Sequence, residues 1–184
     1  MRSEKEKMLA GELYDPADAE LVAERTRART LCHQLNALVP PDDSRKRTLL
    51  ASLFGYTCDA SVGTPFHCDY GYNVRLASNV YFNVGCVLLD VMPIAIGRNA
   101  LLGPGVHIYA ASHPMRAVER QSGKESGSAV TIGDDVWIGG NAVVCPGVTV
   151  GAGCVIGAGS VVTRAIPAGV FAAGNPCRVI RSIT

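Results

Sequence analysis

An aliphatic residue returns every six positions through much of this 184-residue chain. The longest such series is Ile132, Ile138, Val144, Val150, Ile156 and Val162. A period of six matches neither the alternation of a half-buried strand nor the 3.6-residue turn of an α-helix. It is typical of a parallel β-helix, in which each hexad forms one short strand and one turn, and three hexads complete a triangular coil. We therefore predict a mainly β protein.

Two shorter series precede this one, and glycine commonly follows the aliphatic residue. Their inward positions are Tyr70, Leu76, Phe82, Leu88, Ile96, Leu102 and Ile108. Each coil can bury its inward side chains only by stacking on neighbouring coils, so the predicted core is a column. The glycine-rich segment from residue 150 to residue 161 keeps the six-residue register and lacks the spacing of a phosphate-binding loop. We interpret its glycines as corners of the β-helix.

Two interruptions break the register. The first lies between residues 88 and 96 and contains Asp90, and the second lies between residues 108 and 132. The second interruption is a polar, charged segment that begins at His113. Insertions into a solenoid leave its surface as loops and often carry function. We predict such a loop over residues 113–129.

Residues 1–57 have a different pattern, and we predict a helical region there, ahead of a β-helical domain over residues 58–184. Asp15 suits the N-terminal cap of the main helix, and Pro16 suits its first position. A second, shorter helix is expected from about Ser44. The main helix also carries three arginines: Arg25, Arg27 and Arg29. We interpret them as a solvated face, with a substrate or interface contact as the alternative.

The composition argues against several classes of function. The formal net charge is only +1, so the chain lacks the broad basic face on which many nucleic-acid-binding domains depend. No apolar run approaches the ~18 residues of a membrane-spanning helix, and the first residues hold no apolar signal-peptide core. We therefore expect a cytoplasmic protein that binds neither nucleic acid nor membrane. The seven cysteines form no CxxC pair and no zinc spacing, so we expect reduced thiols and no metal site.

The histidines are the first candidates for catalysis. The chain has four: His33, His67, His107 and His113. We interpret the first three as surface or structural residues, with His107 at a corner of the β-helix. Zinc binding is not expected, because His107 and His113 lie on successive sides of one coil and point in different directions. From the residues alone, His113 has two alternative interpretations: a loop residue or a catalytic base. No nucleophilic serine or cysteine context stands out, which favours direct transfer between two bound substrates.

The C-terminal region holds few charges apart from three arginines. These are Arg164, Arg178 and Arg181. They are interpreted either as solvated surface residues or as part of a pocket for an anionic, phosphate-bearing co-substrate.

Several longer motifs accompany the hexads: EKEKMLAGELYDPAD, FHCDYGYN, LLDVMPIAIG, PGVHIYAASHP, VTIGDDVWIGGNAVVCPGVTVG and AAGNPCRVI. With these motifs the chain resembles, over essentially its whole length, the bacterial maltose O-acetyltransferases. These belong to the hexapeptide-repeat sugar O-acetyltransferases, with the galactoside and nodulation acetyltransferases. The resemblance implies a left-handed parallel β-helix and a homotrimer with active sites between subunits. It also implies acetyl-CoA as co-substrate and a sugar as acceptor.

The resemblance further implies roles for single residues. It makes His113 the general base that takes a proton from a sugar hydroxyl, a role that suits imidazole. It makes the Gly140 backbone N–H, helped by Asn83, the donor that stabilises the oxyanion. Coenzyme A contacts are implied for Trp137, Gly140, Ala158, Thr163, Arg164, Arg178 and Arg181. Acceptor contacts are implied for Asp15, Arg25, Asp69, Asp90 and Glu125.

Three positions depart from the galactoside acetyltransferases. Asp69 replaces a serine, Pro16 replaces an acidic residue, and Glu125 stands near the place of a methionine. These differences favour a glucose- or maltose-like acceptor. The alternatives for Asp69, Asp90 and Arg25 are structural or surface roles. For the whole chain, the alternatives are transfer to another hydroxyl or to an amine, and a non-catalytic β-helical trimer.

Overall fold

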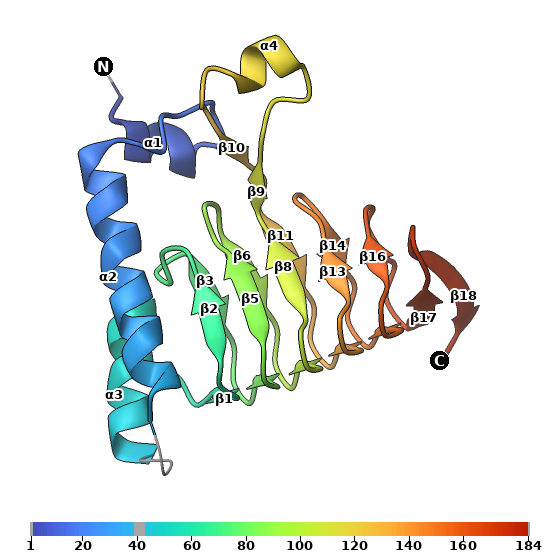
Figure 1. The fold of residues 1–184 in the computed structure, drawn as a ribbon. Helices are drawn as coiled ribbons and strands as arrows, with labels where there is room; N and C mark the ends of the chain where they lie inside the picture. Colours follow the sequence, from blue (N-terminus) through green and yellow to red (C-terminus); the bar gives the residue numbers. More distant parts are fainter. Residues whose placement is uncertain (1, 39–42, 184) are drawn as a thin grey trace.

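The computed structural model describes residues 2–38 and 43–183. The helices α2 (Ala19–Asn36) and α3 (Asp43–Phe54) stand upright at one end of a column of β-strand coils, and the C-terminal strands close the other end (Figure 1). One segment projects from the upper edge of the column, close to the N-terminal residues (Figure 1). Helices and coils share one hydrophobic core.

Three helices precede the column: α1 (Glu4–Leu9), α2 (Ala19–Asn36) and α3 (Asp43–Phe54). Ser3 caps α1 in a capping box, in which its side chain accepts from the Glu6 N–H and the Glu6 side chain accepts from the Ser3 N–H. Helix α2 packs on the first coil, where the Sγ atoms of Cys32 and Cys68 lie 3.8 Å apart. All seven cysteines are free thiols.

The prediction that Asp15 caps the main helix is wrong. Asp18 caps α2, because its side chain accepts hydrogen bonds from the backbone N–H groups of Glu20 and Leu21. Asp15 accepts from the Ala17 N–H at 2.8 Å instead. Residues 15–18 therefore form a turn, and Pro16 stays outside the helix.

The described strands of the column form three sheets, one on each side of the triangular coil. Face 1 consists of β2 (Phe66–Cys68), β5 (Cys86–Leu89), β8 (His107–Tyr109), β13 (Val143–Val144) and β16 (Val161–Val162). Face 2 consists of β3 (Val74–Leu76), β6 (Ile94–Ile96), β11 (Val130–Ile132) and β14 (Thr149–Val150). Face 3 consists of β1 (Ser61–Val62), β4 (Tyr81–Phe82), β7 (Leu101–Leu102), β12 (Trp137–Ile138), β15 (Val155–Ile156), β17 (Val170–Ala173) and β18 (Arg178–Ser182). Only β18 pairs antiparallel among these described strands.

Parallel pairing stacks each inward aliphatic residue on its equivalent in the next coil. On face 3, Phe82, Leu102, Ile138 and Ile156 are in register and buried. Burying a side chain of this size stabilises the fold by ~1.5–3 kcal/mol. The hexad residues from 132 to 162 are all buried in the same way, which confirms the six-residue prediction.

Two details differ from the sequence prediction. The inward positions begin before Tyr70, inside the domain predicted from residue 58, because Val62 on β1 and Phe66 on β2 already face inward and are buried. Gly63 follows Val62 as glycine follows many later inward residues, whereas no glycine follows Phe66. His107 does not lie at a corner; it belongs to β8 and pairs with Val87 and Val143 on either side.

The corner between faces 1 and 2 is wide in the first two coils. The chain needs eight residues to pass from Leu88 to Ile96, against six from Val144 to Val150. The next coil inserts the long loop, which contains β9 (Ala111–Ser112), α4 (Ala117–Arg120) and β10 (Ser126–Gly127). Strands β9 and β10 pair antiparallel, so the extrusion begins before His113 and is partly ordered by its own strands.

Candidate active site

A cavity of about 460 Å³ lies between α2 and the wide corners of the first two coils. Its lining consists of Pro16, Ala17, Val22, Arg25, Arg29, Asp69, Tyr70, Val91 and Glu125. The structure thus brings together three predicted acceptor contacts: Arg25, Asp69 and Glu125. Asp15 is exposed beside this lining, and its backbone N–H donates to Glu4 at 2.6 Å. A concave site with a few convergent polar groups is typical of small-ligand binding.

Asp90 does not line the cavity, contrary to its predicted acceptor contact. Its side chain is fully buried and accepts hydrogen bonds from the backbone N–H groups of Asp69, Tyr70 and Gly71 at 3.0, 2.9 and 2.7 Å. Burial raises the pKa of Asp90 to about 7, and the hydrogen bonds from the Tyr70 and Gly71 N–H groups oppose that rise. Asp90 therefore holds the turn that presents Asp69, and its neighbour Val91 contributes to the lining.

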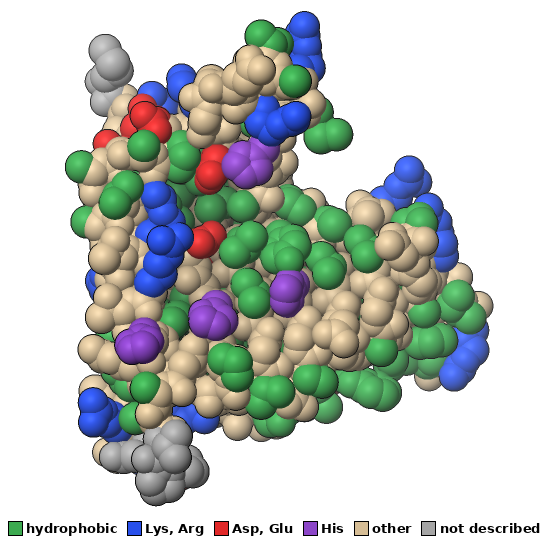
Figure 2. Space-filling view, in the orientation of Figure 1, with side chains coloured by type: hydrophobic (Ala, Val, Ile, Leu, Met, Phe, Trp, Pro, Cys, Tyr) green, Lys and Arg blue, Asp and Glu red, His purple; other side chains and the backbone are tan. Residues whose placement is uncertain are grey.

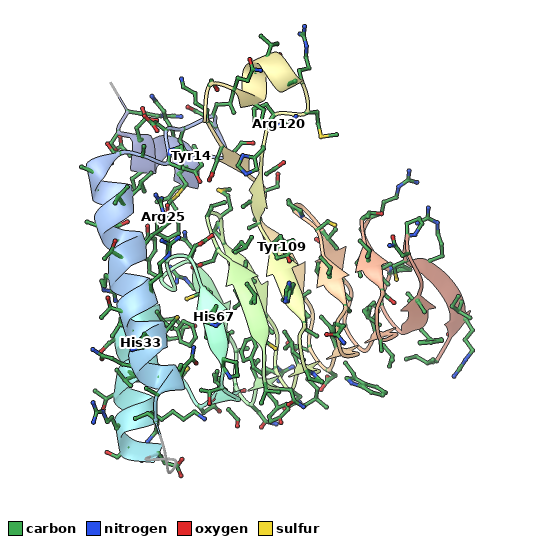
Figure 3. All side chains as sticks on the ribbon, in the orientation of Figure 1. Tyr14, Arg25, His33, His67, Tyr109 and Arg120 are labelled. Carbon is green, nitrogen blue, oxygen red and sulfur yellow. The ribbon has the colours of Figure 1, made fainter. Side chains whose placement is uncertain are left out.

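Arg25 is fixed by contacts and is not a solvated residue. Its guanidinium lies 5.7 Å from the centre of the Tyr70 ring and donates to the Tyr70 hydroxyl at 2.6 Å. A second nitrogen donates to the Pro16 carbonyl. Figure 3 shows Arg25 between α2 and the first coils. Burial raises the pKa of Asp69, while the positive charges of Arg25 and Arg29 oppose the rise.

Glu125 joins the projecting loop to the N-terminal segment. The Tyr14 hydroxyl donates to Glu125 Oε2 at 2.8 Å, and Figure 3 shows Tyr14 below the loop. The two residues also exchange backbone hydrogen bonds of 3.0 and 3.1 Å. The loop is therefore anchored at Glu125, which is held at the cavity by a residue 111 positions away.

His113 lies just after β9 and reaches the same region. Its Nε2 is 4.0 Å from Glu125 Oε1, and its side chain is 58% exposed. Histidine and acidic side chains gather below the projecting segment (Figure 2). Arg120 on α4 donates to the Pro114 and Met115 carbonyls at 3.1 and 3.0 Å, which restrains the loop next to His113. An imidazole beside a polar cavity can take a proton from a bound hydroxyl.

Known proteins with the same sequence pattern match nearly the whole chain. Residues 7–57 match the maltose acetyltransferase hexapeptide capping motif, and residues 129–164 match the bacterial transferase hexapeptide family of six repeats. A maltose O-acetyltransferase from Clostridium difficile 630 is 46% identical, and its crystal structure superposes with a TM-score of 0.97 over 100% of this chain and 98% of that one. The chain belongs to the hexapeptide-repeat acetyltransferases. It is an acyltransferase of the maltose O-acetyltransferase type, and the predicted left-handed parallel β-helix is confirmed.

Two further relatives of this acetyltransferase cover almost its full length. A hexapeptide-repeat acetyltransferase from Vibrio cholerae O1 biovar eltor, crystallised with acetyl coenzyme A, is 39% identical over 100% of both chains with a TM-score of 0.92. Nodulation protein L of Rhizobium leguminosarum bv. viciae is 48% identical over 97% of this chain and 94% of its own.

Face 1 of the column separates Asn83 from His113. Asn83 follows β4 at the corner between faces 3 and 1, where its Oδ1 accepts from the Val84 N–H at 2.8 Å. His113 leaves the column at the opposite edge of face 1, after β8 and β9. The width of face 1 therefore lies between the two residues.

The residues predicted to contact coenzyme A also lie at different places on the column. Gly140 and Ala158 follow β12 and β15 at the same corner as Asn83, and Trp137 on β12 is 54% exposed. Thr163 and Arg164 follow β16 at the edge that carries the loop, whereas Arg178 and Arg181 belong to β18. Among the described residues, no ion pair involves these three arginines: Arg164, Arg178 and Arg181.

Sequence reasoning missed several parts of the cavity. Tyr14 and Tyr70 lie within two of the longer motifs, and Tyr70 is also a hexad position, but no contact with substrate was predicted for either. Such a contact was predicted for Asp90 and not for its neighbour Val91. Arg29 belongs to the arginine run, in which contact with substrate was the weaker interpretation. Within residues 2–38 and 43–183, no group of three His, Cys, Asp or Glu side chains is placed to bind a metal ion. None of the described helices has both the length and the apolarity needed to cross a membrane.

Proposed function

We propose that this acetyltransferase transfers the acetyl group of acetyl-CoA to a hydroxyl of a glucose- or maltose-like sugar. The observation that carries the proposal is His113, which lies 4.0 Å from Glu125 at a cavity also lined by Arg25 and Asp69. Carboxylates and a guanidinium offer both acceptors and donors to sugar hydroxyls. The maltose O-acetyltransferase of Clostridium difficile and the acetyl coenzyme A complex of the Vibrio cholerae relative support the same acceptor class and donor.

The chemistry needs one base and no covalent enzyme intermediate. His113 takes the proton of the sugar hydroxyl while the hydroxyl oxygen attacks the thioester carbonyl carbon. The resulting oxyanion accepts hydrogen bonds from the Gly140 backbone N–H and Asn83. The carbon–sulfur bond then breaks, and the thiol of coenzyme A leaves with the proton that His113 held.

Acetyl-CoA is the donor in this proposal, and the residues along the column suit it. Arg164, Arg178 and Arg181 have no carboxylate partner among the described residues, which leaves their charges for the phosphates of coenzyme A. Trp137, Ala158 and Thr163 are exposed on the column and form the remaining contacts of our proposed donor groove.

We further propose that the active enzyme is a homotrimer with sites between subunits. His113 and Asn83 lie at opposite edges of face 1, so a second copy must supply one of them to each site. Face 3 offers a surface for association, because Tyr81, Leu101 and Trp137 form an in-register outer row with exposures of 40%, 48% and 54%.

An acceptor comparison tests the proposed substrate class. Purified protein with acetyl-CoA is supplied with glucose, maltose, a galactoside or a simple amine, and release of free thiol is followed. We expect release that depends on glucose or maltose. A preference of roughly 10³-fold in kcat/KM for the amine would assign the enzyme to N-acetyl transfer instead.

A further inference from the structure

We infer that Tyr14 holds Glu125 as the charge partner of His113, so that both act as positioning residues for the catalytic base. This inference rests on the proposed role of His113 as base and deepens it. It gives Glu125 a task beyond contact with the acceptor, and it connects the N-terminal segment to the reaction.

The contact between Tyr14 and Glu125 is extensive. The side chain of Tyr14 is fully buried, and its hydroxyl donates to Glu125 Oε2 at 2.8 Å. The backbone N–H and carbonyl of each residue bond those of the other, as in a short antiparallel ladder. A buried hydroxyl that lost this acceptor would remain unsatisfied, so the contact fixes Glu125 firmly.

With Oε2 occupied by Tyr14, the other oxygen of Glu125 faces His113. The distance of 4.0 Å between Oε1 and Nε2 exceeds a hydrogen bond and suits an ion pair. When His113 takes the acceptor proton it becomes a cation, and a carboxylate at this distance favours the charged form. Bound sugar and coenzyme A exclude water, which strengthens the attraction during the reaction.

Other charged groups near His113 have different partners. Arg25 is bonded to Tyr70 and Pro16, and Arg120 is bonded to the carbonyls of Pro114 and Met115. Asp69 and Arg29 line the same cavity without an ion pair to His113. In the described part of the chain, the ion pairs join His113 to Glu125 alone.

The test compares the full-length variants Glu125→Gln, Tyr14→Phe and Glu119→Gln with the wild type, using glucose and acetyl-CoA. Glu119→Gln is the matched control, because Glu119 belongs to the same loop but pairs with Arg116. We expect Glu125→Gln to lower kcat about tenfold while KM for glucose changes little. Tyr14→Phe lowers kcat by a smaller factor. The control variant Glu119→Gln leaves kcat and KM unchanged. Thermal unfolding shows whether each variant is folded.

The inference is overturned if Glu125→Gln raises KM for glucose but leaves kcat unchanged, since Glu125 would then only contact the acceptor. A second measurement needs no acceptor. Diethyl pyrocarbonate modifies neutral imidazole, and mass spectrometry of peptides reports each histidine separately. In Glu125→Gln the rate of His113 modification at a fixed pH changes relative to that of exposed His67; an unchanged ratio contradicts the inference. Failure of glucose to react would count against the proposed function alone.

Discussion

The carboxylate of Asp90 lies beneath the turn that presents Asp69 and accepts a hydrogen bond from the Asp69 backbone N–H at 3.0 Å. The same carboxylate accepts from Tyr70 and Gly71, so one buried group orders the corner of the acceptor cavity. Asp69, a proposed acceptor contact, is thus held by a group that does not line the cavity.

Asp90 makes stability depend on pH. Burial raises the pKa of Asp90 from its ordinary value of 3.8 to about 7, so between these values the folded state binds more protons than the unfolded state. The stabilisation is full below pH ~4 and is lost as the pH rises through about 7. We expect the wild type to lose roughly 2–3 kcal/mol relative to Asp90→Asn between pH 5 and pH 8 in urea unfolding. A difference between the two proteins that stays constant with pH would contradict this assignment.

Gly71 is required by both its backbone and its surroundings. Its φ is +80°, and a Cβ there would lie 2.5 Å from the Leu53 carbonyl oxygen. Gly123 has a similar φ of +73° but open space around it, which makes it a matched control. We expect Gly123→Ala to cost about 1 kcal/mol of unfolding free energy and Gly71→Ala at least about 2 kcal/mol more. Equal losses in thermal or urea unfolding would show that the contact with Leu53 is easily relieved.

Arg25 should act on acceptor binding. It lines the cavity and is held there by Tyr70, whereas Arg27 on the same helix bonds the Ser52 carbonyl away from the cavity. We expect Arg25→Met to raise KM for glucose roughly tenfold and Arg27→Met to leave it within about twofold. Steady-state kinetics at saturating acetyl-CoA measure both. Similar effects from the two substitutions would place Arg25 outside the acceptor site.

Active sites between subunits predict that two inactive variants restore activity when they assemble into mixed trimers. His113→Ala and Asn83→Ala are each expected to lose about 10²-fold or more in kcat. When the two variants are co-expressed with different tags and purified on both, every mixed cyclic trimer contains one intact site, so about one third of wild-type activity returns. Mixed trimers that stay inactive would mean that both residues serve the same subunit or that one of them has no role.

The sequence predicted the column well because its signal is local. Each inward hexad residue, such as Ile138, packs on the equivalent residue of the next coil. A six-residue period is therefore enough to predict which residues of the column are buried. The start of α2 was mispredicted because Asp15 and Asp18 are both plausible caps, and only the turn between them decides. The contact of Tyr14 with Glu125 spans 111 positions and has no periodic signal.

Asp90 shows a second limit of the sequence. A carboxylate at a break in the repeat resembles a site residue, but three backbone N–H groups converge on it and draw it into the core. The neighbouring Val91 reaches the cavity instead. Which of two adjacent side chains faces inward at a widened corner depends on the fold of that corner, and no spacing rule describes it.

The central claim is that His113 is the base for acetyl transfer to a sugar. The most direct measurement is glucose-dependent release of thiol from acetyl-CoA by the wild type and by His113→Ala, with His67→Ala as a control for loss of an exposed histidine. The account predicts a fall of ~10²-fold or more for His113→Ala and little change for His67→Ala. Sugar-dependent turnover retained at the wild-type rate in His113→Ala would contradict it.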